Sequence, residues 1–96
     1  MSLNRYAKRR DKNEADIIAI AEQIGWFLTR LDTPTDWLGW LCGNWYPIEI
    51  KQPKGKYTDA QDKFIDGCLE RGARVLTWRT SDDCLRDTNA ARLGKL

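Results

Sequence analysis

The chain has 96 residues, of which 42% are hydrophobic and 31% charged, as in a single globular domain, and no apolar run reaches the roughly 18 residues needed to span a membrane. Its net charge is only +2, but residues 1–12 carry +4 and residues 13–96 carry −2, so a basic arm precedes a mildly acidic body. The absence of histidine excludes Ser–His–Asp and Cys–His nucleophiles and histidine metal sites, so any hydrolytic chemistry must use carboxylates, lysine, tyrosine or a metal bound mainly by oxygen.

The basic arm, residues 1–12, is separated here from a single domain over residues 13–96. Arg9 and Arg10 in the arm are candidate contacts for a polyanion such as DNA, although a solvated tail would have the same composition. The N-terminus is charged and has no signal-peptide core, so we expect the protein to be in the cytoplasm.

The first half of the chain predicts a helix followed by three strands. Apolar residues recur at helical spacing within residues 12–24, where Asp11 and Glu14 fit a capping pattern at the start and Gly25 is expected to end the helix. Alternating and β-branched residues predict strands over residues 26–31, 36–42 and 45–51. A two-residue hairpin turn is expected at Gly43-Asn44, between the second and third strands.

The second half predicts a helix, a strand and a helix. Thr58 and Gln61 have the spacing of a capping box at the start of a helix over residues 59–70, and Gly72 is expected to follow its end. A strand over residues 74–80 and a helix over residues 81–93 complete the chain. The fold class is therefore α/β, with the order α-β-β-β-α-β-α and helices packed on a mixed sheet.

The hairpin brings charged side chains to one face of the sheet. With the turn at Gly43-Asn44, Asp36 lies opposite Lys51 and Leu38 lies opposite Glu49. Because opposed residues and alternate residues share a face, the side chains of Asp36, Glu49 and Lys51 are expected to point the same way. The other face is apolar and is expected to cover the core.

Two carboxylates held close together repel each other, and a divalent cation that prefers oxygen ligands relieves this repulsion. Asp36 and Glu49 are therefore candidate ligands for Mg²⁺ or Mn²⁺. Lys51 could orient or deprotonate an attacking water and stabilise charge on a phosphate. The alternative is an exposed strand face with a Glu–Lys surface pair.

Four further residues can be read in two ways. Glu14 lies at the edge of an apolar helix face and could reach a metal, or it could simply favour the helix N-terminus. Gln61 could position water or phosphate, or only complete the capping box. Lys54 and Lys56 could follow a DNA backbone, or only solvate a turn.

Five tryptophans are many for a chain of this length. Trp37 is expected in the core. Trp40 and Trp45 lie near the hairpin tip, where they could stack on bases or pack against the core or a partner subunit. The three cysteines, Cys42, Cys68 and Cys84, include no CxxC pair and are expected to be reduced thiols rather than a zinc site or disulfides.

These residues together resemble a known family. Their order is that of the PD-(D/E)XK nuclease superfamily, and more narrowly of the virus-type replication-repair nucleases, VRR-NUC: Glu14 in a helix, then Asp36, then Glu49-Ile50-Lys51, then Gln61 in the next helix. The resemblance covers about residues 13–85. It implies a restriction-endonuclease-like fold.

The resemblance also implies the ligands of a metal. Asp36 and Glu49 would bind Mg²⁺ or Mn²⁺ together with the backbone carbonyl of Ile50, and Glu14 would contribute through the metal or its waters. The usual Pro-Asp pair appears here as Pro34-Thr35-Asp36, with one residue inserted. Asp32 is therefore an alternative ligand, although the hairpin pairing favours Asp36.

The catalytic roles and the substrate follow from the same resemblance. Lys51 would act on the nucleophilic water and Gln61 would support the site. Stand-alone members of the family look like phage-encoded homodimers that cut branched DNA, including four-way junctions, which would place this chain in the host cytoplasm. The arginines of the family signature have three candidates here: Arg71, Arg74 and Arg79.

The sequence therefore predicts a metal-dependent endonuclease that hydrolyses phosphodiester bonds in branched DNA. A nucleic-acid-binding module with the same fold but no cleavage is the alternative, and it would bind DNA without a divalent metal. A third possibility is an interaction domain whose tryptophans contact other proteins.

Overall fold

A computed structural model describes residues 12–96 of the chain, so Asp11 and the arm residues Arg9 and Arg10 lie outside the described residues. The elements follow in the predicted order α-β-β-β-α-β-α. Their bounds are α1 (Glu14–Gln23), β1 (Phe27–Arg30), β2 (Trp37–Leu41), β3 (Asn44–Ile50), α2 (Asp59–Glu70), β4 (Leu76–Trp78) and α3 (Ser81–Arg92). Within residues 12–96, no helix is both long enough and apolar enough to cross a membrane.

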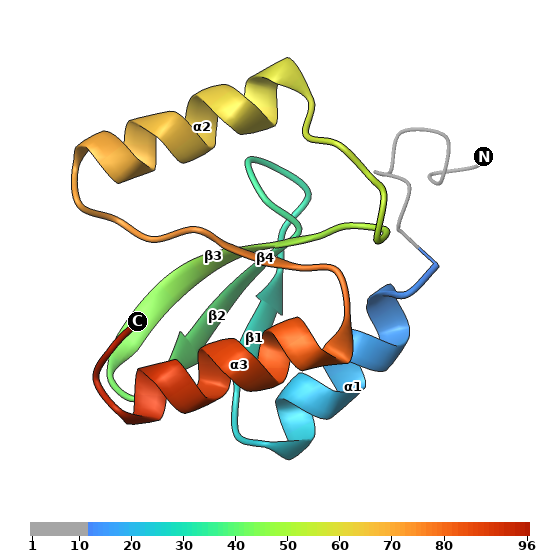
Figure 1. The fold of residues 1–96 in the computed structure, drawn as a ribbon, viewed down its shortest axis with the longest axis vertical. Helices are drawn as coiled ribbons and strands as arrows, with labels where there is room; N and C mark the ends of the chain where they lie inside the picture. The colour runs from blue at the N-terminus through green and yellow to red at the C-terminus, as the bar shows by residue number, and fades with distance from the viewer. Residues whose placement is uncertain (1–11) are drawn as a thin grey trace.

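The four strands form one mixed sheet in the order β1-β2-β3-β4. The neighbouring pairs β1–β2 and β2–β3 are antiparallel, whereas β3 and β4 are parallel and are joined by the crossover through α2. Figure 1 shows α1 and α3 together on one side of the sheet and α2 standing apart from them. The sheet is therefore covered by two helices on one face, which we call the core face, and we call the opposite face the outer face.

The core lies between the core face and the helices α1 and α3. Its centre is aromatic: the ring of Trp26 meets Trp78 edge-on at 5.1 Å and Tyr46 at 5.9 Å between centroids. Both buried indoles are satisfied, because Trp26 Nε1 donates to Thr88 Oγ1 at 2.8 Å and Trp78 Nε1 donates to Asp87 Oδ2 at 2.9 Å. The aliphatic part of the core is formed mainly by Ile17, Ile18, Ala21, Leu41, Ile48, Ile50, Leu76 and Ala91.

The predicted turn at Gly43-Asn44 is wrong by one residue. Cys42 and Gly43 form the turn instead, and both have positive φ angles, 53° and 85°, as a type I′ turn requires. The sequence favours Asn44 over Cys42 for such a conformation, because asparagine adopts positive φ more readily. Here the pairing of Leu41 with Asn44 takes Asn44 into β3.

The earlier turn shifts the pairing of β2 with β3 by two residues. Leu38 lies opposite Pro47 rather than Glu49, so the predicted pairs Leu38–Glu49 and Asp36–Lys51 are both wrong. A shift of two residues leaves every side chain on its original face, whereas a shift of one would reverse them all. Extending the observed register by one step places Asp36 opposite Glu49, so the two carboxylates come closer than predicted.

The helix termini follow the predicted signals at most ends. α2 covers the predicted range, and Thr58 and Gln61 form a complete capping box at its start. The start of α1 differs from the prediction, because the helix begins at Glu14 with Asn13 at the N-cap position, and Asp11 of the predicted capping pattern lies outside the described residues. Asn13 makes no side-chain cap, because its amide is used elsewhere, as described below.

Candidate functional site

The side chains of Glu49, Lys51 and Gln61 form one hydrogen-bonded group, which we call the Glu49–Lys51–Gln61 group. Gln61 Nε2 donates to Glu49 Oε1 at 2.8 Å, and Lys51 Nζ donates to Gln61 Oε1 at 2.8 Å. The ammonium of Lys51 also lies 3.8 Å from Glu49 Oε1. Both charged side chains are well covered, with 12% of Lys51 and 2% of Glu49 exposed, so their attraction is screened less than that of a surface pair.

Gln61 reaches this group because α2 starts beside it. The amide oxygen of Gln61 also accepts from the backbone nitrogen of Thr58 at 3.0 Å, while the backbone nitrogen of Gln61 donates to Thr58 Oγ1 at 3.2 Å. The capping role of Gln61 is therefore confirmed, and the same side chain also contacts Lys51 and Glu49.

Asp36 lies next to the same strand. It is 4% exposed, and its Oδ2 accepts from the backbone nitrogen of Ile50 at 2.8 Å. The loop that carries it is closed by a hydrogen bond of 2.7 Å from the backbone nitrogen of Leu31 to the carbonyl of Asp36. Asp32, the alternative ligand, is exposed in the same loop. The structure therefore brings Asp36, rather than Asp32, to the segment that carries Glu49 and Lys51.

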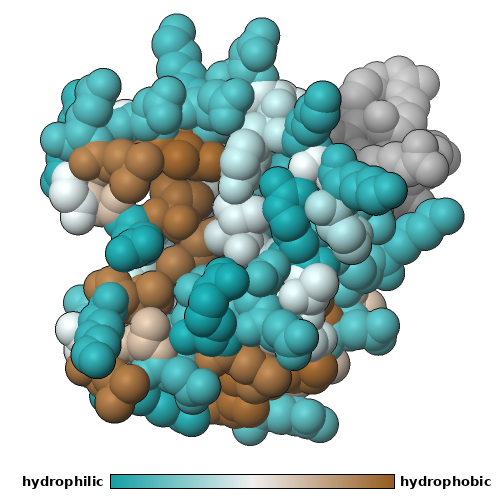
Figure 2. Space-filling view, in the orientation of Figure 1, coloured by the Kyte–Doolittle hydropathy of each residue, from teal (hydrophilic) through white to brown (hydrophobic). Residues whose placement is uncertain are grey.

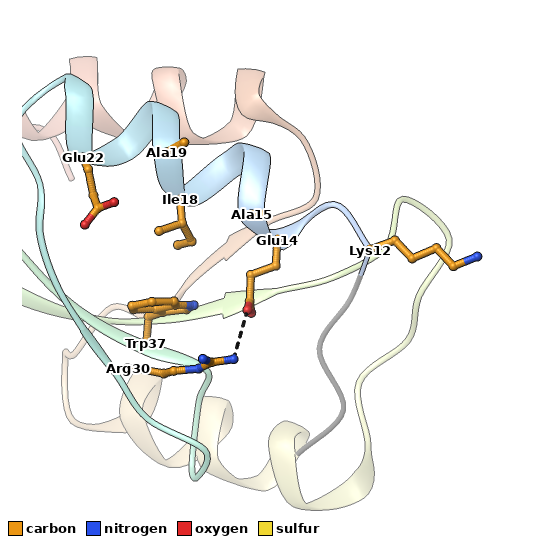
Figure 3. Close-up of a pocket in the computed structure, with 8 residues that line it drawn as sticks. All are labelled: Lys12, Glu14, Ala15, Ile18, Ala19, Glu22, Arg30 and Trp37. Atoms are coloured by element: carbon orange, nitrogen blue, oxygen red, sulfur yellow. Dashed lines mark ion pairs between the residues drawn. The ribbon is translucent and has the colours of Figure 1, made fainter. Parts of the chain in front are cut away.

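Glu14 lies in a different environment. Its carboxylate is 3.8 Å from the guanidinium of Arg30, as the dashed line in Figure 3 marks. Both residues line a pocket of about 410 Å³, together with Lys12 and Trp37. Arg30 also lies 5.9 Å from the ring centroid of Trp37, so β1 and β2 both contribute to the surroundings of Glu14.

Three carboxylates of the predicted site are buried: Glu14 is 7% exposed, Asp36 4% and Glu49 1%. Burial of an ionised carboxylate costs several kcal/mol unless cations or hydrogen-bond donors compensate for it. Carboxylates are rarely buried to this extent, and they cluster where a fold needs them for binding or catalysis.

The carboxylates beside β3 are oxygen donors of the kind that a divalent cation binds. Among residues 12–96, no three or more Asp, Glu or Cys side chains lie close enough together to hold a metal ion. Mg²⁺, however, keeps most of its waters in proteins and commonly binds through only one or two carboxylates. Asp36, which accepts from the Ile50 amide, and Glu49, the residue before Ile50, are two carboxylates of the kind that such a site uses.

The basic residues that the sequence singled out differ in their exposure and contacts. Lys54 and Lys56 are exposed in the loop before α2. Arg71 and Arg74 are exposed after that helix. Arg79 instead supports the loop, because its guanidinium donates to the carbonyl oxygens of Gln52 at 3.0 Å and Gly55 at 2.6 Å.

Some residues beside the site carry no motif in the sequence. Tyr57 hydrogen-bonds through its hydroxyl to Thr77 on β4, and its ring lies 5.7 Å from Lys51 Nζ and 5.9 Å from the guanidinium of Arg79. Asn13 donates to the carbonyl of Lys51 at 2.9 Å and to that of Arg79 at 2.7 Å. In the sequence, Asn13 stands just before a predicted helix, and this position suggests a helix cap rather than these long-range bonds.

The comparisons with known proteins add nothing to this geometry: no family model matches the chain, and neither the curated proteins nor the solved structures contain a match.

Proposed function

We propose that the protein is a metal-dependent endonuclease with a restriction-endonuclease-like fold that hydrolyses phosphodiester bonds in DNA. The observation that carries the proposal is the Glu49–Lys51–Gln61 group beside the buried carboxylate of Asp36. Hydrolysis of a phosphodiester without histidine needs carboxylates and a cation in one place, and this group supplies them. The resemblance of the sequence to the VRR-NUC family supports the same conclusion.

The role of each residue follows from its contacts. Lys51 would present a positive charge to the attacked phosphate and orient the attacking water, since its ammonium is fixed by Gln61 at 2.8 Å. Glu49 accepts from Gln61 and lies 3.8 Å from the same ammonium, so both charged side chains would be held in place by Gln61. Gln61 is a positioning residue, because it acts through Lys51 and Glu49.

Asp36 and Glu49 would hold Mg²⁺ or Mn²⁺, with the carbonyl of Ile50 as a further oxygen donor. A bound divalent ion lowers the pKa of water and neutralises charge that develops on phosphate. The hydrogen bond from the Ile50 amide to Asp36 would keep that carboxylate oriented towards β3. Glu14, paired with Arg30, would act from further away, through waters rather than directly.

The preferred substrate that we propose is branched DNA, including four-way junctions, and the acting form is a homodimer in the cytoplasm. A chain of 96 residues offers little surface for a branched substrate, and a two-fold dimer would present two centres to two strands. Sedimentation velocity across a hundredfold range of protein concentration tests the dimer independently of activity.

The cleavage test uses end-labelled four-way junctions and matched linear duplexes, each incubated with Mg²⁺, with Mn²⁺ or with EDTA. We expect cleavage only with metal, and a loss of about 100-fold or more in Lys51→Ala and Glu49→Gln. Lys95→Ala and Glu22→Gln, at exposed positions, are the matched controls and should cleave normally. Equal products in all variants would contradict the proposal, and binding without cleavage in any metal would favour the non-catalytic module.

A further inference from the structure

A groove follows α2 from its middle to the start of β3. It consists of two hollows of about 380 and 270 Å³ that share Ala73. Phe64 and Cys68 line the first, and Trp45 and Pro47 line the second. Figure 2 shows the molecule hollowed below α2, with hydrophobic side chains along the underside of the helix. In residues 12–96, α2 buries none of its own residues, so its apolar side is available to line a binding surface.

The charged side chains that line the groove all have the same sign. Lys63 and Arg71 border the first hollow and Arg74 borders the second, and no Asp or Glu is among the residues that line either one. Within residues 12–96, Glu70 lies 3.9 Å from the guanidinium of Arg71, and since both side chains are 76% exposed this pair neutralises little of the charge. Three cations along one groove, in a domain that is acidic as a whole, indicate a polyanionic ligand.

Aromatic rings lie at the β3 end of the groove. Trp45 is 51% exposed, and the ring of Phe27 meets it edge-on at 6.1 Å. Trp40 pairs with both residues across the strands, so three aromatic side chains stand side by side on the outer face of the sheet. By contrast, Trp26 and Trp78 on the core side are nearly completely buried. Exposed rings of this kind bind unpaired bases by stacking, whereas base pairs within a duplex have no free face to offer.

The second hollow lies on the strand that carries the candidate cleavage site. Trp45, Pro47 and Glu49 alternate along β3 and therefore share the outer face, and Trp45 and Pro47 also line the hollow. The four steps along the strand from Trp45 to Glu49 span about 13 Å, which is the length of about four stacked nucleotides. A strand whose base stacks on Trp45 would therefore need about four further nucleotides to extend along β3 to the candidate site.

We propose that this groove binds one unpaired DNA strand, with bases against Trp45 and Phe64 and phosphates against Lys63, Arg71 and Arg74. The identity of the strand as DNA and its arrival at Glu49 rest on the proposed function, whereas the binding itself does not. The groove would let the proposed nuclease recognise those branched substrates in which nucleotides at or beside the branch point are unpaired.

The test measures the binding of a fluorescein-labelled oligo(dT) of 20 nucleotides, and of a duplex of the same length, by anisotropy in EDTA. We expect tighter binding of the single strand, affinity that falls with salt, and quenching of tryptophan fluorescence on binding. Trp45→Ala and Arg74→Ala should each weaken binding of the single strand about tenfold. Both positions are exposed, and circular dichroism confirms that the variants fold. Leu93→Ala and Arg86→Ala, exposed on the α3 side, are the matched controls and should bind normally.

The proposal would be overturned by unchanged affinity in Trp45→Ala and Arg74→Ala, by tighter binding of the duplex, or by tighter binding of an RNA of the same length. A dimer that Trp45→Ala dissociates while DNA affinity is unchanged would also overturn it, because the groove would then be occupied by a second copy. The binding assay distinguishes this proposal from the nuclease. If the groove variants lose affinity but the wild type cleaves nothing in any metal, strand binding by the groove is supported and the nuclease proposal is contradicted. If Glu49→Gln abolishes cleavage and the groove variants bind normally, the nuclease proposal is supported and strand binding by the groove is contradicted.

Discussion

Gln61 Nε2 lies 2.8 Å from Glu49 Oε1, and this contact links the first turn of α2 to the outer face of β3. The other atom of the same amide, Oε1, accepts from Lys51 Nζ and from the backbone nitrogen of Thr58. Because Gln61 takes part in both, the capping of the N-terminal end of α2 is coupled to the alignment of Glu49 and Lys51. A change at Gln61 has consequences for stability and for activity, and two substitutions separate them.

Gln61→Ala removes the capping partner and both side-chain contacts, so we expect a loss of about 1 kcal/mol in the free energy of unfolding together with a loss of cleavage. Gln61→Glu keeps a side chain that can complete the capping box but places a second carboxylate against Glu49. It should lose cleavage while retaining more of the stability than Gln61→Ala. Urea unfolding and the junction cleavage assay measure the two effects.

Asp83 offers a matched control, since it completes the capping box of α3 with Thr80, far along the chain from Gln61. Asp83→Ala should cost a similar free energy of unfolding and leave cleavage per folded molecule unchanged. A loss of cleavage in Asp83→Ala as large as that in Gln61→Ala would show that the effect at Gln61 comes from stability alone.

A substitution at Glu14 tests how far the proposed metal site extends from β3. Glu14→Gln keeps the shape of the side chain but removes its charge, so we expect several-fold weaker binding of Mn²⁺ with a folded protein. Isothermal titration calorimetry with MnCl₂ measures the affinity. Glu22→Gln changes an exposed acid in the same pocket and should leave Mn²⁺ binding unaltered. Identical Mn²⁺ affinity in Glu14→Gln and wild type would remove Glu14 from the metal site.

The three thiols should differ in reactivity. Burial of Cys84 raises the pKa of its thiol from 9.0 to about 11, an increase to which Asp87 adds and which the hydrogen bond with Thr88 opposes. With a disulfide reagent at pH 8, exposed Cys42 should react first, half-buried Cys68 next and Cys84 only after unfolding.

The raised pKa of Cys84 also has a defined effect on stability. Because the folded state holds the proton more tightly than the unfolded state, the contribution of Cys84 is complete below pH 9 and is lost as the pH rises to about 11. Replacement by Ala should flatten the alkaline limb of the stability curve, measured by urea unfolding from pH 8 to 11. An alkaline limb of the same slope in the variant would assign it to other groups.

Two glycines should respond in opposite directions to alanine. A Cβ at Gly39 would lie 2.6 Å from Ile48 Cδ1 and 2.9 Å from the ring of Trp26, so Gly39→Ala should destabilise the fold by about 1–3 kcal/mol. At Gly67, inside α2, a new Cβ would lie 3.6 Å from Arg71 Nη1, an ordinary contact distance. Gly67→Ala should therefore stabilise the protein by about 0.5–1 kcal/mol through helix propensity. Thermal unfolding measures both, and an unchanged transition in Gly67→Ala would mean that α2 contributes little to it.

The sequence predicts the faces of the hairpin better than its pairing. Alternation of apolar and polar residues sets which side of the sheet each side chain occupies. A shift of the pairing by two residues leaves each side chain on the same side. The pairing itself depends on which two residues adopt positive φ, and Cys42 is an uncommon choice. The burial of Glu49 and the partners of Lys51 could not be predicted, because they depend on where the start of α2 lies in space.

The long-range contacts of the site also could not be predicted from local sequence patterns. Thr58 and Gln61 are three residues apart, so a local rule finds their capping box. The bonds from Asn13 to Lys51 and Arg79 span 38 and 66 residues, and no local pattern encodes them. The pairing of Glu14 with Arg30 likewise depends on how α1 crosses β1 and β2.

The bonds of Asn13 have one more consequence. They join the start of α1 to the residue after β3 and to the residue after β4, so three elements of the domain meet at one side chain. Removal of that side chain, as in Asn13→Ala, would take this donor from the carbonyls of Lys51 and Arg79 at once and would loosen the backbone that carries Lys51.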